Sequence, residues 1–235
     1  MKKSNIFTVS ALSLCLLASA GCSSMTNMGK GALIGGGGGA AAGAGIGALI
    51  GGGKGAGIGA AIGAAVGAGA GTLIGRKMDK QKKELQEQLA KKAEVESVTD
   101  QNGLQAIKVT FNGGILFPTN GTTLSTGARQ DLTSFATSLI NNPETNVQIF
   151  GFTDDTGTYQ VNERVATGRA DAVRTYLLNS GVAASRLTAQ GLPMQDYVAS
   201  NSTPEGRAQN RRVEIYITAN QQMIKQAENG TLAMN

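Results

Sequence analysis

Glycine recurs at every fourth position over a long stretch in the N-terminal part of the chain. Twelve glycines follow one another at this four-residue spacing, without a break, from residue 31 to residue 75. On an α-helix, residues four apart lie along one ridge, so glycine at each of them opens a groove that a second helix can approach closely. In water each glycine costs a helix up to about 1 kcal/mol, whereas in lipid the backbone has little alternative to a helix. The pattern therefore favours close-packed helices in or on a membrane, with a flexible low-complexity spacer as the alternative.

The same stretch is an internal repeat with a period of 24 residues. Lys30 is followed by GALIG and Lys54 by GAGIG, and the GALIG at Gly47 recurs as GTLIG at Gly71. Each unit is long enough to span about 30 Å as a helix, and the GGGK between the units is typical of a turn. We predict a helical hairpin over residues 31–75. Because glycine and alanine dominate the segment, its insertion into lipid would be marginal.

The first residues of the chain have the three parts of a secretory signal. Lys2 and Lys3 are followed by an apolar run over residues 9–17 and then by small residues up to Gly21. An apolar core this short is not expected to remain as a membrane-spanning helix. We therefore predict that residues 1–21 are a signal peptide and that the mature chain is exported.

Cys22 stands directly after this signal. The sequence LLASAGCSS around it resembles a bacterial lipoprotein signal, in which the cysteine receives a diacylglycerol. Ser19 departs from the resemblance, because such signals usually have Leu there, and a plain signal that leaves a free thiol is the alternative. Cleavage of the signal removes Cys15, so Cys22 is left without a cysteine partner in the exported chain. Acylation gives this single cysteine a role. By the same resemblance, Ser23 rather than Asp after the cysteine favours the outer membrane of a Gram-negative bacterium. Residues 22–30 are predicted to be a linker.

The amino-acid composition excludes several classes of function. The chain contains no histidine, which removes histidine-based catalytic triads, histidine general bases and histidine metal sites. The two cysteines make no disulfide framework, and no carboxylate pair stands in a recognised hydrolase setting. The formal charge of +5 is spread too thinly to indicate nucleic-acid binding. We therefore expect no catalytic residue, no metal and no cofactor, and a protein that is not an enzyme.

Residues 76–95 are mostly charged or polar, with Leu85 and Leu89 four residues apart on one side. This pattern predicts a charged helical connector that is solvated, with self-association through the leucines as an alternative. Basic side chains gather just after the glycine segment, which suits either contact with anionic headgroups or the solubilising face of a spacer. These basic residues are Arg76, Lys77, Lys80, Lys82 and Lys83.

Residues 96–220 have the composition of an ordinary globular domain. Segments rich in β-branched and aromatic residues predict strands at 104–111, 115–117, 146–152, 186–192 and 211–219. Apolar residues three and four apart predict helices at 125–140 and 159–178, and 203–210 suits a helical turn or more. The expected inner faces of the two longer helices are Leu132, Phe135, Ala136 and Leu139, and Val161, Val165, Val173 and Leu177. The order is βαβαβ with a closing strand, which predicts an α+β sandwich with helices on a mixed sheet. Residues 221–235 are predicted to be a C-terminal tail.

Several motifs of this domain occur in order at consistent distances. They are TDDTG at 153–157, Asn162, Arg169 followed by Ala170, and NSTPEGRAQNRRVEI at 201–215. Together they resemble the peptidoglycan-binding domain shared by the OmpA porin C-terminus, the peptidoglycan-associated lipoprotein and the flagellar stator protein MotB. The resemblance covers roughly residues 108–218. With the lipid signal and the glycine repeat, the whole chain resembles the glycine-zipper lipoproteins of the YiaD type.

The resemblance implies binding of the peptidoglycan stem peptide, chiefly its diaminopimelate, without chemistry on it. Asp154 matches the family aspartate that takes the ammonium group of diaminopimelate, and Arg169 matches the arginine that takes the carboxylate. An arginine can pair bidentately with a carboxylate, which a lysine cannot reproduce. Taken alone, Asp154 would be a turn or cap residue and Arg169 a solvated helix residue; the motif favours the binding role for both.

The resemblance assigns further residues to the peptidoglycan-binding site. Asn162 is expected to orient the loop, and Asn210 with Arg211 to lie against the same pocket, with structural bonding inside the domain as the alternative. The remaining predicted site residues are Thr153, Thr119 and Asn120, whereas Arg207 and Arg212 are interpreted as mainly structural.

Two positions depart from the family pattern. Phe152 stands where the family commonly has His, and Pro118 stands where an acidic residue is frequent. Neither is the ammonium or the carboxylate partner, so binding is expected to survive while the rim of the site and its pH response differ.

The sequence therefore predicts a lipid-anchored envelope protein that tethers a membrane to the cell wall. Its predicted partners are peptidoglycan, membrane lipid through acylated Cys22 and residues 31–75, and possible further copies of itself; no nucleic acid is expected. The alternative is a glycine-zipper membrane oligomer, or an assembly or stress factor, that wall binding merely positions. A stator component is disfavoured, because the membrane span of a stator of this kind needs an acidic residue and residues 31–75 contain none.

Overall fold

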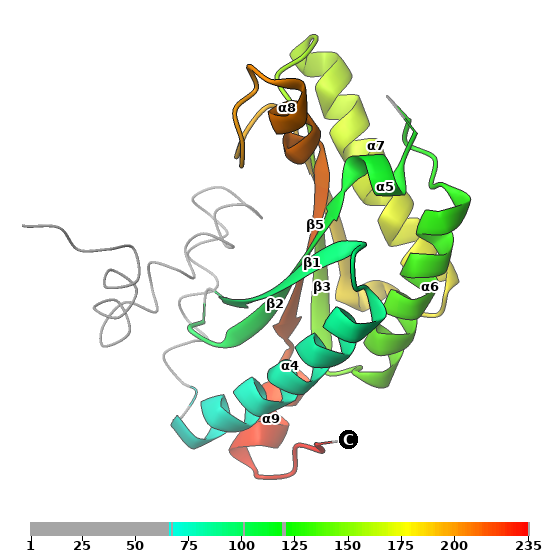
Figure 1. Cartoon of the computed structure of the whole chain (residues 1–235). Helices are drawn as coiled ribbons and strands as arrows, with labels where there is room; N and C mark the ends of the chain where they lie inside the picture. The colour runs from blue at the N-terminus through cyan, green and yellow to red at the C-terminus, as the bar shows by residue number, and fades with distance from the viewer. Residues whose placement is uncertain (1–65, 67, 101, 119–120, 235) are drawn as a thin grey trace, which may run out of the picture.

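A five-stranded sheet forms the centre of the domain in the computed structural model (Figure 1), which describes residues 66, 68–100, 102–118 and 121–234. The strands are β1 (Ala93–Thr99), β2 (Gln105–Asn112), β3 (Thr145–Phe152), β4 (Leu187–Leu192) and β5 (Arg212–Ala219), in the spatial order β1-β2-β5-β3-β4. Neighbouring strands are antiparallel except β3 and β4, which are parallel and are connected through α7 (Tyr159–Asn179). The predicted α+β class, with helices on a mixed sheet, is confirmed.

Part of the predicted organisation lies outside the described residues. This applies to the signal peptide, Cys22, the linker and the glycine segment up to residue 65, and to Thr119 and Asn120. The glycine-zipper hairpin therefore stays a prediction. Among the described helices, none combines the length and apolar character needed to cross a membrane.

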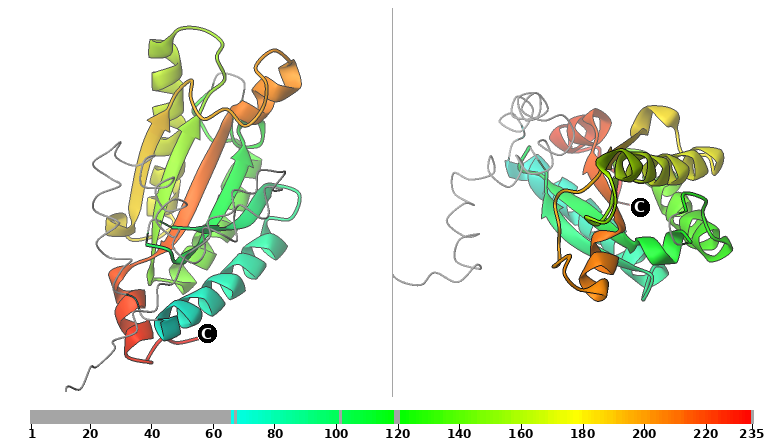
Figure 2. Two further views of the ribbon diagram at one scale, coloured as in Figure 1. Left: turned by 90° about the vertical axis from the view of Figure 1, so that its left-hand side faces the viewer. Right: turned by 90° about the horizontal axis from the view of Figure 1, so that it is seen from above.

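Two helices, α6 (Thr126–Asn141) and α7, pack against one another and against the same face of the sheet (Figure 2). The side chain of Ser125 accepts a hydrogen bond from Ala128 N and starts α6. The predicted inner face of α6 is fully buried, as are Val173 and Leu177 of α7. The prediction for Val161 is wrong, because its side chain is 45% exposed. The first turns of α7 extend beyond the core and are therefore free to line a surface site.

Glycines on β3 and β4 allow α7 to lie unusually close to the sheet. A Cβ atom at Gly151 would lie 2.2 Å from Ala166 O, and one at Gly191 would lie 2.4 Å from Thr167 N. These contacts involve helix backbone, which cannot move aside without displacing α7. The glycines thus fix the position of α7 relative to the carboxyl end of β3, from which the TDDTG loop continues.

The predicted strand at residues 115–117 is wrong. The chain instead forms a short helix, α5 (Gly113–Leu116), because the side chain of Asn112 accepts a hydrogen bond from Gly114 N and caps it. Gly113 N also donates to Arg211 O at 2.7 Å. This bond joins α5 to the end of α8 (Pro204–Asn210), the helix predicted at 203–210.

The charged segment at residues 76–95 is not a solvated connector. It belongs to α4 (Ala68–Gln88) and to β1, and α4 buries one apolar stripe completely against the domain. Its apolar members are four or seven residues apart and therefore lie on one face, which leaves most of the helix surface to polar and charged residues. Its fully buried members are Ile74, Met78 and Leu85, followed by Leu89 just after the helix.

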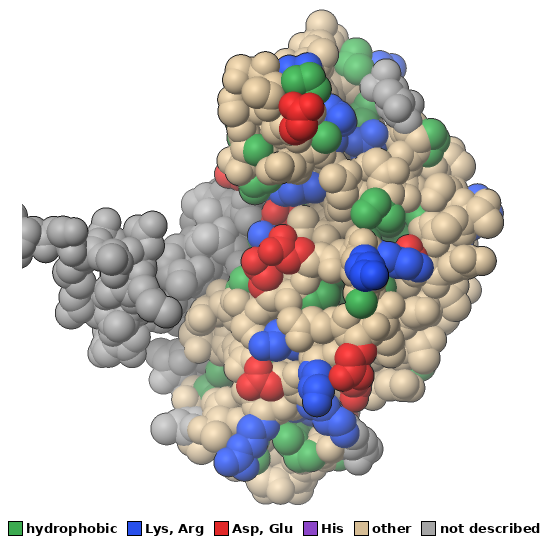
Figure 3. All heavy atoms as spheres, in the orientation of Figure 1, with side chains coloured by type: hydrophobic (Ala, Val, Ile, Leu, Met, Phe, Trp, Pro, Cys, Tyr) green, Lys and Arg blue, Asp and Glu red, His purple; other side chains and the backbone are tan. Residues whose placement is uncertain are grey.

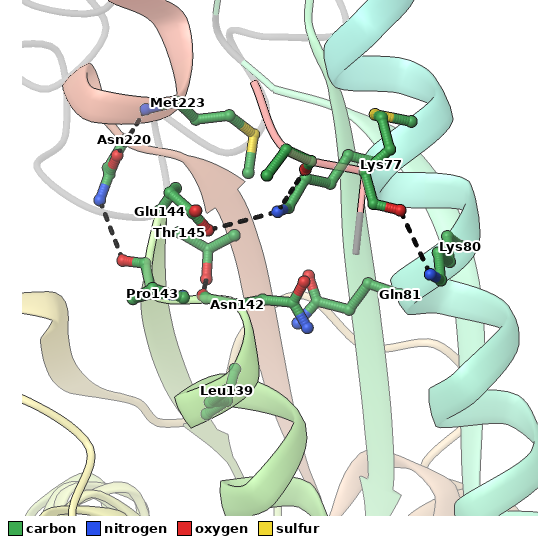
Figure 4. Close-up of polar contacts among 12 residues, drawn as sticks. Lys77, Lys80, Gln81, Leu139, Asn142, Pro143, Glu144, Thr145, Asn220 and Met223 are labelled. Atoms are coloured by element: carbon green, nitrogen blue, oxygen red, sulfur yellow. Dashed lines mark hydrogen bonds and ion pairs between the residues drawn. The ribbon is translucent and has the colours of Figure 1, made fainter. Parts of the chain in front are cut away.

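Lys77 anchors α4 to two other parts of the domain (Figure 4). Its ammonium lies 3.5 Å from Glu144 Oε2 and donates a hydrogen bond to Ala233 O at 2.9 Å. Both charged side chains are nearly buried, so removing either partner would leave the other unpaired. Lys77 is therefore a structural residue rather than a free contact for lipid headgroups.

The predicted C-terminal tail contains a further helix, α9 (Gln221–Glu228), which packs on α4. Asn220 caps it by accepting from Met223 N and also donates to Pro143 O (Figure 4). The buried side chains of α9 are Met223, Ile224 and Ala227. Segments from both ends of the described chain thus complete the domain around α6 and the sheet.

Charged side chains of both signs are interspersed over the face of the domain shown in Figure 3. Partly exposed ion pairs of the described residues include Lys82 with Asp79 at 3.4 Å and Lys108 with Glu96 at 3.9 Å. Such pairs contribute little to stability. On this face, the excess positive charge is not gathered into one basic patch.

Candidate functional site

A pocket of about 940 Å³ opens between the start of α7, the loop after β3 and the end of α8. Of the eight residues predicted to bind peptidoglycan, the structure brings Thr153, Asp154, Asn162, Arg169 and Arg211 together in its lining. Asn210 does not line it, and Thr119 and Asn120 are outside the described residues. Residues from distant parts of the sequence therefore converge on one concave surface.

Asp154 is the carboxylate of this pocket and is only 6% exposed. Its Oδ1 accepts a hydrogen bond from Thr156 N at 2.9 Å, and its Oδ2 lies 2.6 Å from Arg211 Nη1. Burial favours the protonated acid, but the hydrogen bonds from Thr156 and Arg211 and the arginine's charge outweigh it. They hold the pKa of Asp154 below its ordinary value. Asp154 is therefore an oriented anion at neutral pH.

Arg169 projects from α7 and is almost completely buried, with 3% exposure. Its Nε donates to Gly121 O at 3.0 Å, and its guanidinium carbon lies 5.3 Å from the centre of the Phe117 ring. Burial and the nearby Arg211 lower the pKa of Arg169, although an arginine stays charged at neutral pH. Among the described residues, no carboxylate lies within ion-pair distance of it. Arg169 is a fixed cation with capacity for an anionic ligand.

Asn162 and Thr153 hold the TDDTG loop in place. Asn162 Nδ2 donates to Thr156 O at 2.9 Å and to Thr158 O at 3.2 Å, while Thr153 Oγ1 accepts from Met194 N at 3.1 Å. Both side chains are buried. The loop that carries Asp154 is thus fixed to α7 on one side and to the chain after β4 on the other.

Arg211 and Asn210, adjacent in sequence, have different surroundings. The Arg211 side chain is 40% exposed and reaches Asp154. Asn210 is fully buried; its Oδ1 accepts from Val198 N and Ala199 N, and its Nδ2 donates to Ala199 O and the Asn201 side chain. The structural alternative for Asn210 therefore fits its contacts, while Arg211 faces the pocket.

The structure adds cationic side chains to the pocket that sequence reasoning did not assign to it. Arg164 of α7 and Arg207 of α8 also line it, so guanidinium groups outnumber carboxylates. Arg207 Nη1 additionally donates to Asn201 O at 2.7 Å, as its structural interpretation required. The signal for Arg164 was present: it lies on the first turns of α7, between Asn162 and Arg169. Because Val161 was expected to face the core, the first turns of α7 were not considered as part of a surface site, and Arg164 was not assigned to it.

Phe152, one of the two departures, is fully buried outside the pocket. The guanidinium carbon of Arg212 lies 3.8 Å from the centre of its ring, and Arg212 Nε donates to Glu214 Oε1 at 2.7 Å. Arg212 and Glu214 are each 3% exposed, which agrees with the structural interpretation of Arg212. Phe152 thus supports the sheet beneath the site and presents no titratable group to the pocket.

Comparisons with known proteins agree with this description. Residues 116–211 match the OmpA family, and residues 1–79 match the YMGG-like Gly-zipper family. The "Probable lipoprotein YiaD" of Escherichia coli (strain K12) is 43% identical over 104 residues, which is 44% of this chain and 48% of that protein. The "Peptidoglycan-binding protein ArfA" of Mycobacterium tuberculosis is 39% identical over 112 residues, 48% of this chain and 34% of that protein.

A solved structure shows the same fold. The crystal structure of a MotB-like protein from Desulfovibrio vulgaris is 26% identical, with a TM-score of 0.55 over 63% of this chain and 95% of that chain. The described domain therefore resembles the OmpA family in sequence over residues 116–211 and shares its fold with this MotB-like protein. The predicted resemblance to this domain and to YiaD-type glycine-zipper lipoproteins is confirmed. The chain spans about half of the length of YiaD and about a third of the length of ArfA.

Proposed function

We propose that the chain binds peptidoglycan non-covalently through this pocket and recognises the diaminopimelate of the stem peptide. One observation carries the proposal: a buried carboxylate, Asp154, and a buried guanidinium, Arg169, line the same pocket. The similarity of the domain to the relative named as a peptidoglycan-binding protein supports it. We infer a binding protein without catalytic activity, which the relatives named as a lipoprotein and as a peptidoglycan-binding protein support.

The free end of diaminopimelate carries one ammonium and one carboxylate group. Asp154 would receive the ammonium, and Arg169 would pair with the carboxylate through its Nη atoms. Both side chains are already held by backbone groups of Thr156 and Gly121, so little ordering is needed on binding. The excess of guanidinium groups in the pocket suits a ligand whose other carboxylates remain ionised.

Arg211 neutralises Asp154 in the free protein and must share or release it when an ammonium group arrives. Its side chain is 40% exposed, so the guanidinium can leave Asp154 for solvent or for a ligand carboxylate at low cost. The Arg211 backbone stays fixed, because its carbonyl accepts from Gly113 N. The exchange therefore requires movement of one side chain only.

Cosedimentation with isolated cell-wall sacculi tests the proposed ligand. We expect the full chain to pellet with sacculi that contain diaminopimelate, and free diaminopimelate to release it. Nα-acetyl-lysine amide, which has a side-chain ammonium but no carboxylate, should release much less at equal concentration. Equal release by both compounds would show that the carboxylate is not recognised.

We further propose that Cys22 is acylated and anchors the chain to the outer membrane, with the OmpA-like domain in the periplasm. The lipoprotein-type signal and the relative named as a lipoprotein support this. Replacing Cys22 by Ala should remove the added lipid mass and move the protein from the membrane fraction to the soluble fraction. An unchanged mature mass and an unchanged membrane fraction would contradict acylation. Binding and anchoring together would tether the membrane to the wall.

The match of residues 1–79 to a Gly-zipper family favours one second candidate function. The glycine segment would then form a membrane oligomer, or serve assembly or stress resistance, and wall binding would only position it. In that case crosslinked oligomers should persist in membranes when Asp154 is changed to Asn.

A further inference from the structure

The pocket carries more positive charge than the free end of diaminopimelate requires. Its described lining contains four arginines, Arg164, Arg169, Arg207 and Arg211, and one carboxylate, Asp154. In the proposed complex Asp154 and Arg169 receive the two charged groups of that free end, and Arg211 is the partner of Asp154 in the free protein. The guanidinium groups of Arg164 and Arg207 therefore remain without a role in recognition.

These two arginines differ in how they are held. Arg207 is half-buried, and its Nη1 donates to Asn201 O at 2.7 Å, so part of its hydrogen-bonding capacity is used within the domain. Arg164 is exposed, and none of the described residues forms an ion pair or a hydrogen bond with its side chain. The acidic residue beside it, Glu163, is also exposed and does not line the pocket. Arg164 is thus the arginine of the pocket that is available to a ligand without breaking a contact among the described residues.

Arg164 and Arg169 flank the face that α7 presents to the pocket. The middle of this face consists of Val161, Val165 and Gly168, which are three and four residues apart and therefore lie on one side of the helix. The two arginines are separated by about 7.5 Å along the helix axis, the rise of five residues. Because Arg169 is buried and Arg164 is exposed, Arg169 lies in the depth of the pocket and Arg164 at its mouth.

The wall of the pocket beside Arg169 is closed by the chain that precedes α6. A Cβ atom at Gly168 would lie 2.9 Å from Thr122 Cγ2, so this chain packs directly on α7. It is also fixed to the site, because Gly121 O accepts the hydrogen bond from Arg169 Nε. A ligand whose end is held by Arg169 is therefore directed along the first turns of α7, where Arg164 stands.

We propose that Arg164 is a specificity-determining residue that pairs with the α-carboxylate of the D-glutamate next to diaminopimelate in the stem peptide. The inference rests on the proposed function. In L-Ala-γ-D-Glu-meso-diaminopimelate the glutamate is joined to diaminopimelate through its side-chain carboxyl group, so its α-carboxylate is free. The second carboxylate of diaminopimelate, by contrast, is used in an amide bond wherever the stem continues beyond it. The glutamate carboxylate is therefore an anion that stems of either length offer to the planar guanidinium of Arg164.

Two tripeptides that differ in one group test this role. One is L-Ala-γ-D-Glu-meso-diaminopimelate, and the other, the isoglutamine tripeptide, has a carboxamide in place of the α-carboxylate of glutamate. We expect titration calorimetry with the full chain to give about 5-fold tighter binding of the first, as a partly solvated ion pair provides. Arg164→Gln should lose this preference and bind both tripeptides as wild type binds the isoglutamine tripeptide. Arg129→Gln is the control, because it removes the same charge from an exposed arginine of α6 outside the pocket and should keep the preference.

The possible failures are distinguishable from one another. Equal binding of both tripeptides by wild type would overturn the role of Arg164 and leave the proposed function standing, whereas binding of neither would overturn both. A preference that persists in Arg164→Gln would contradict the assignment, as would an equal loss of the preference in Arg129→Gln. If Arg164→Gln weakened both tripeptides by the same factor, Arg164 would recognise a carboxylate of diaminopimelate and the inference would be wrong.

Discussion

Asp154→Asn should lower the affinity for the diaminopimelate tripeptide by at least about 30-fold, the expected cost of losing one partner of a buried charge pair. The asparagine keeps an oxygen that can accept from Thr156 N, so the loop geometry should be preserved. What it removes is the negative charge that would receive the ammonium group. Titration calorimetry with the full chain measures the loss.

Asp155→Asn is the matched control for this variant. Asp155 is the next residue in the same loop, but its side chain is exposed and does not line the pocket. The change in charge is identical, so any general electrostatic effect on an ammonium-bearing ligand would appear in both variants. Similar affinities of the two variants would show that Asp154 is not the ammonium partner, provided that both keep the unfolding temperature of the wild type.

Arg169→Lys should lower the affinity for the tripeptide by about 10-fold or more, although the charge is retained. A lysine carries a point charge without the planar fork that pairs with a carboxylate at two positions. It would also lose the fixed orientation that the guanidinium has between Gly121 O and the Phe117 ring. The same calorimetric titration, repeated with a ligand whose terminal carboxylate is amidated, measures the effect.

Arg174→Lys provides the comparison on the same helix. Arg174 Nε donates to a backbone carbonyl, Leu187 O, at 3.4 Å, much as Arg169 does to Gly121 O, but Arg174 is not part of the pocket. Its replacement should leave the affinity unchanged. The amidated ligand should bind wild type weakly and should bind Arg169→Lys no worse than wild type. If Arg169→Lys bound the amidated ligand much more weakly than wild type does, the variant would lose affinity without a carboxylate to recognise. Arg169 would then act on the fold rather than on the carboxylate.

Local sequence patterns predicted most of the domain core. The apolar face of α6 and the strand pattern of β3 each depend on residues close in sequence, and the structure has them where expected. The prediction of the pocket residues had another source. Asp154 and Arg169 were assigned through the resemblance to OmpA-like domains, and the structure places both in one pocket.

The errors arose where tertiary contacts decide the conformation. The apolar stripe of α4 is too narrow to distinguish a solvated helix from one buried against β1, β2 and α9. Residues 115–117 have strand-forming side chains, yet the cap at Asn112 and the bond from Gly113 to the end of α8 place residues 113–116 in the short helix α5. Val161 has helical spacing from the core residues, but the sheet ends before the helix does.

The packing of α4 also bears on the glycine segment. α4 begins at Ala68, within the last part of that segment, and its Ile74 is fully buried in the domain core. The end of the glycine repeat is thus attached rigidly to the OmpA-like domain rather than through a loose charged connector. Whatever structure residues 31–65 adopt, force between a membrane anchor and the wall would pass through α4.

The most direct test of the account is cosedimentation of wild type, Asp154→Asn and Asp155→Asn with sacculi that contain diaminopimelate. Each variant neutralises one carboxylate of the wild type, and the two variants differ only in which of the two adjacent aspartates is changed. We predict that wild type and Asp155→Asn pellet together with the sacculi and that Asp154→Asn stays in solution. Equal pelleting of all three proteins would contradict the assignment of this pocket as the peptidoglycan-binding site.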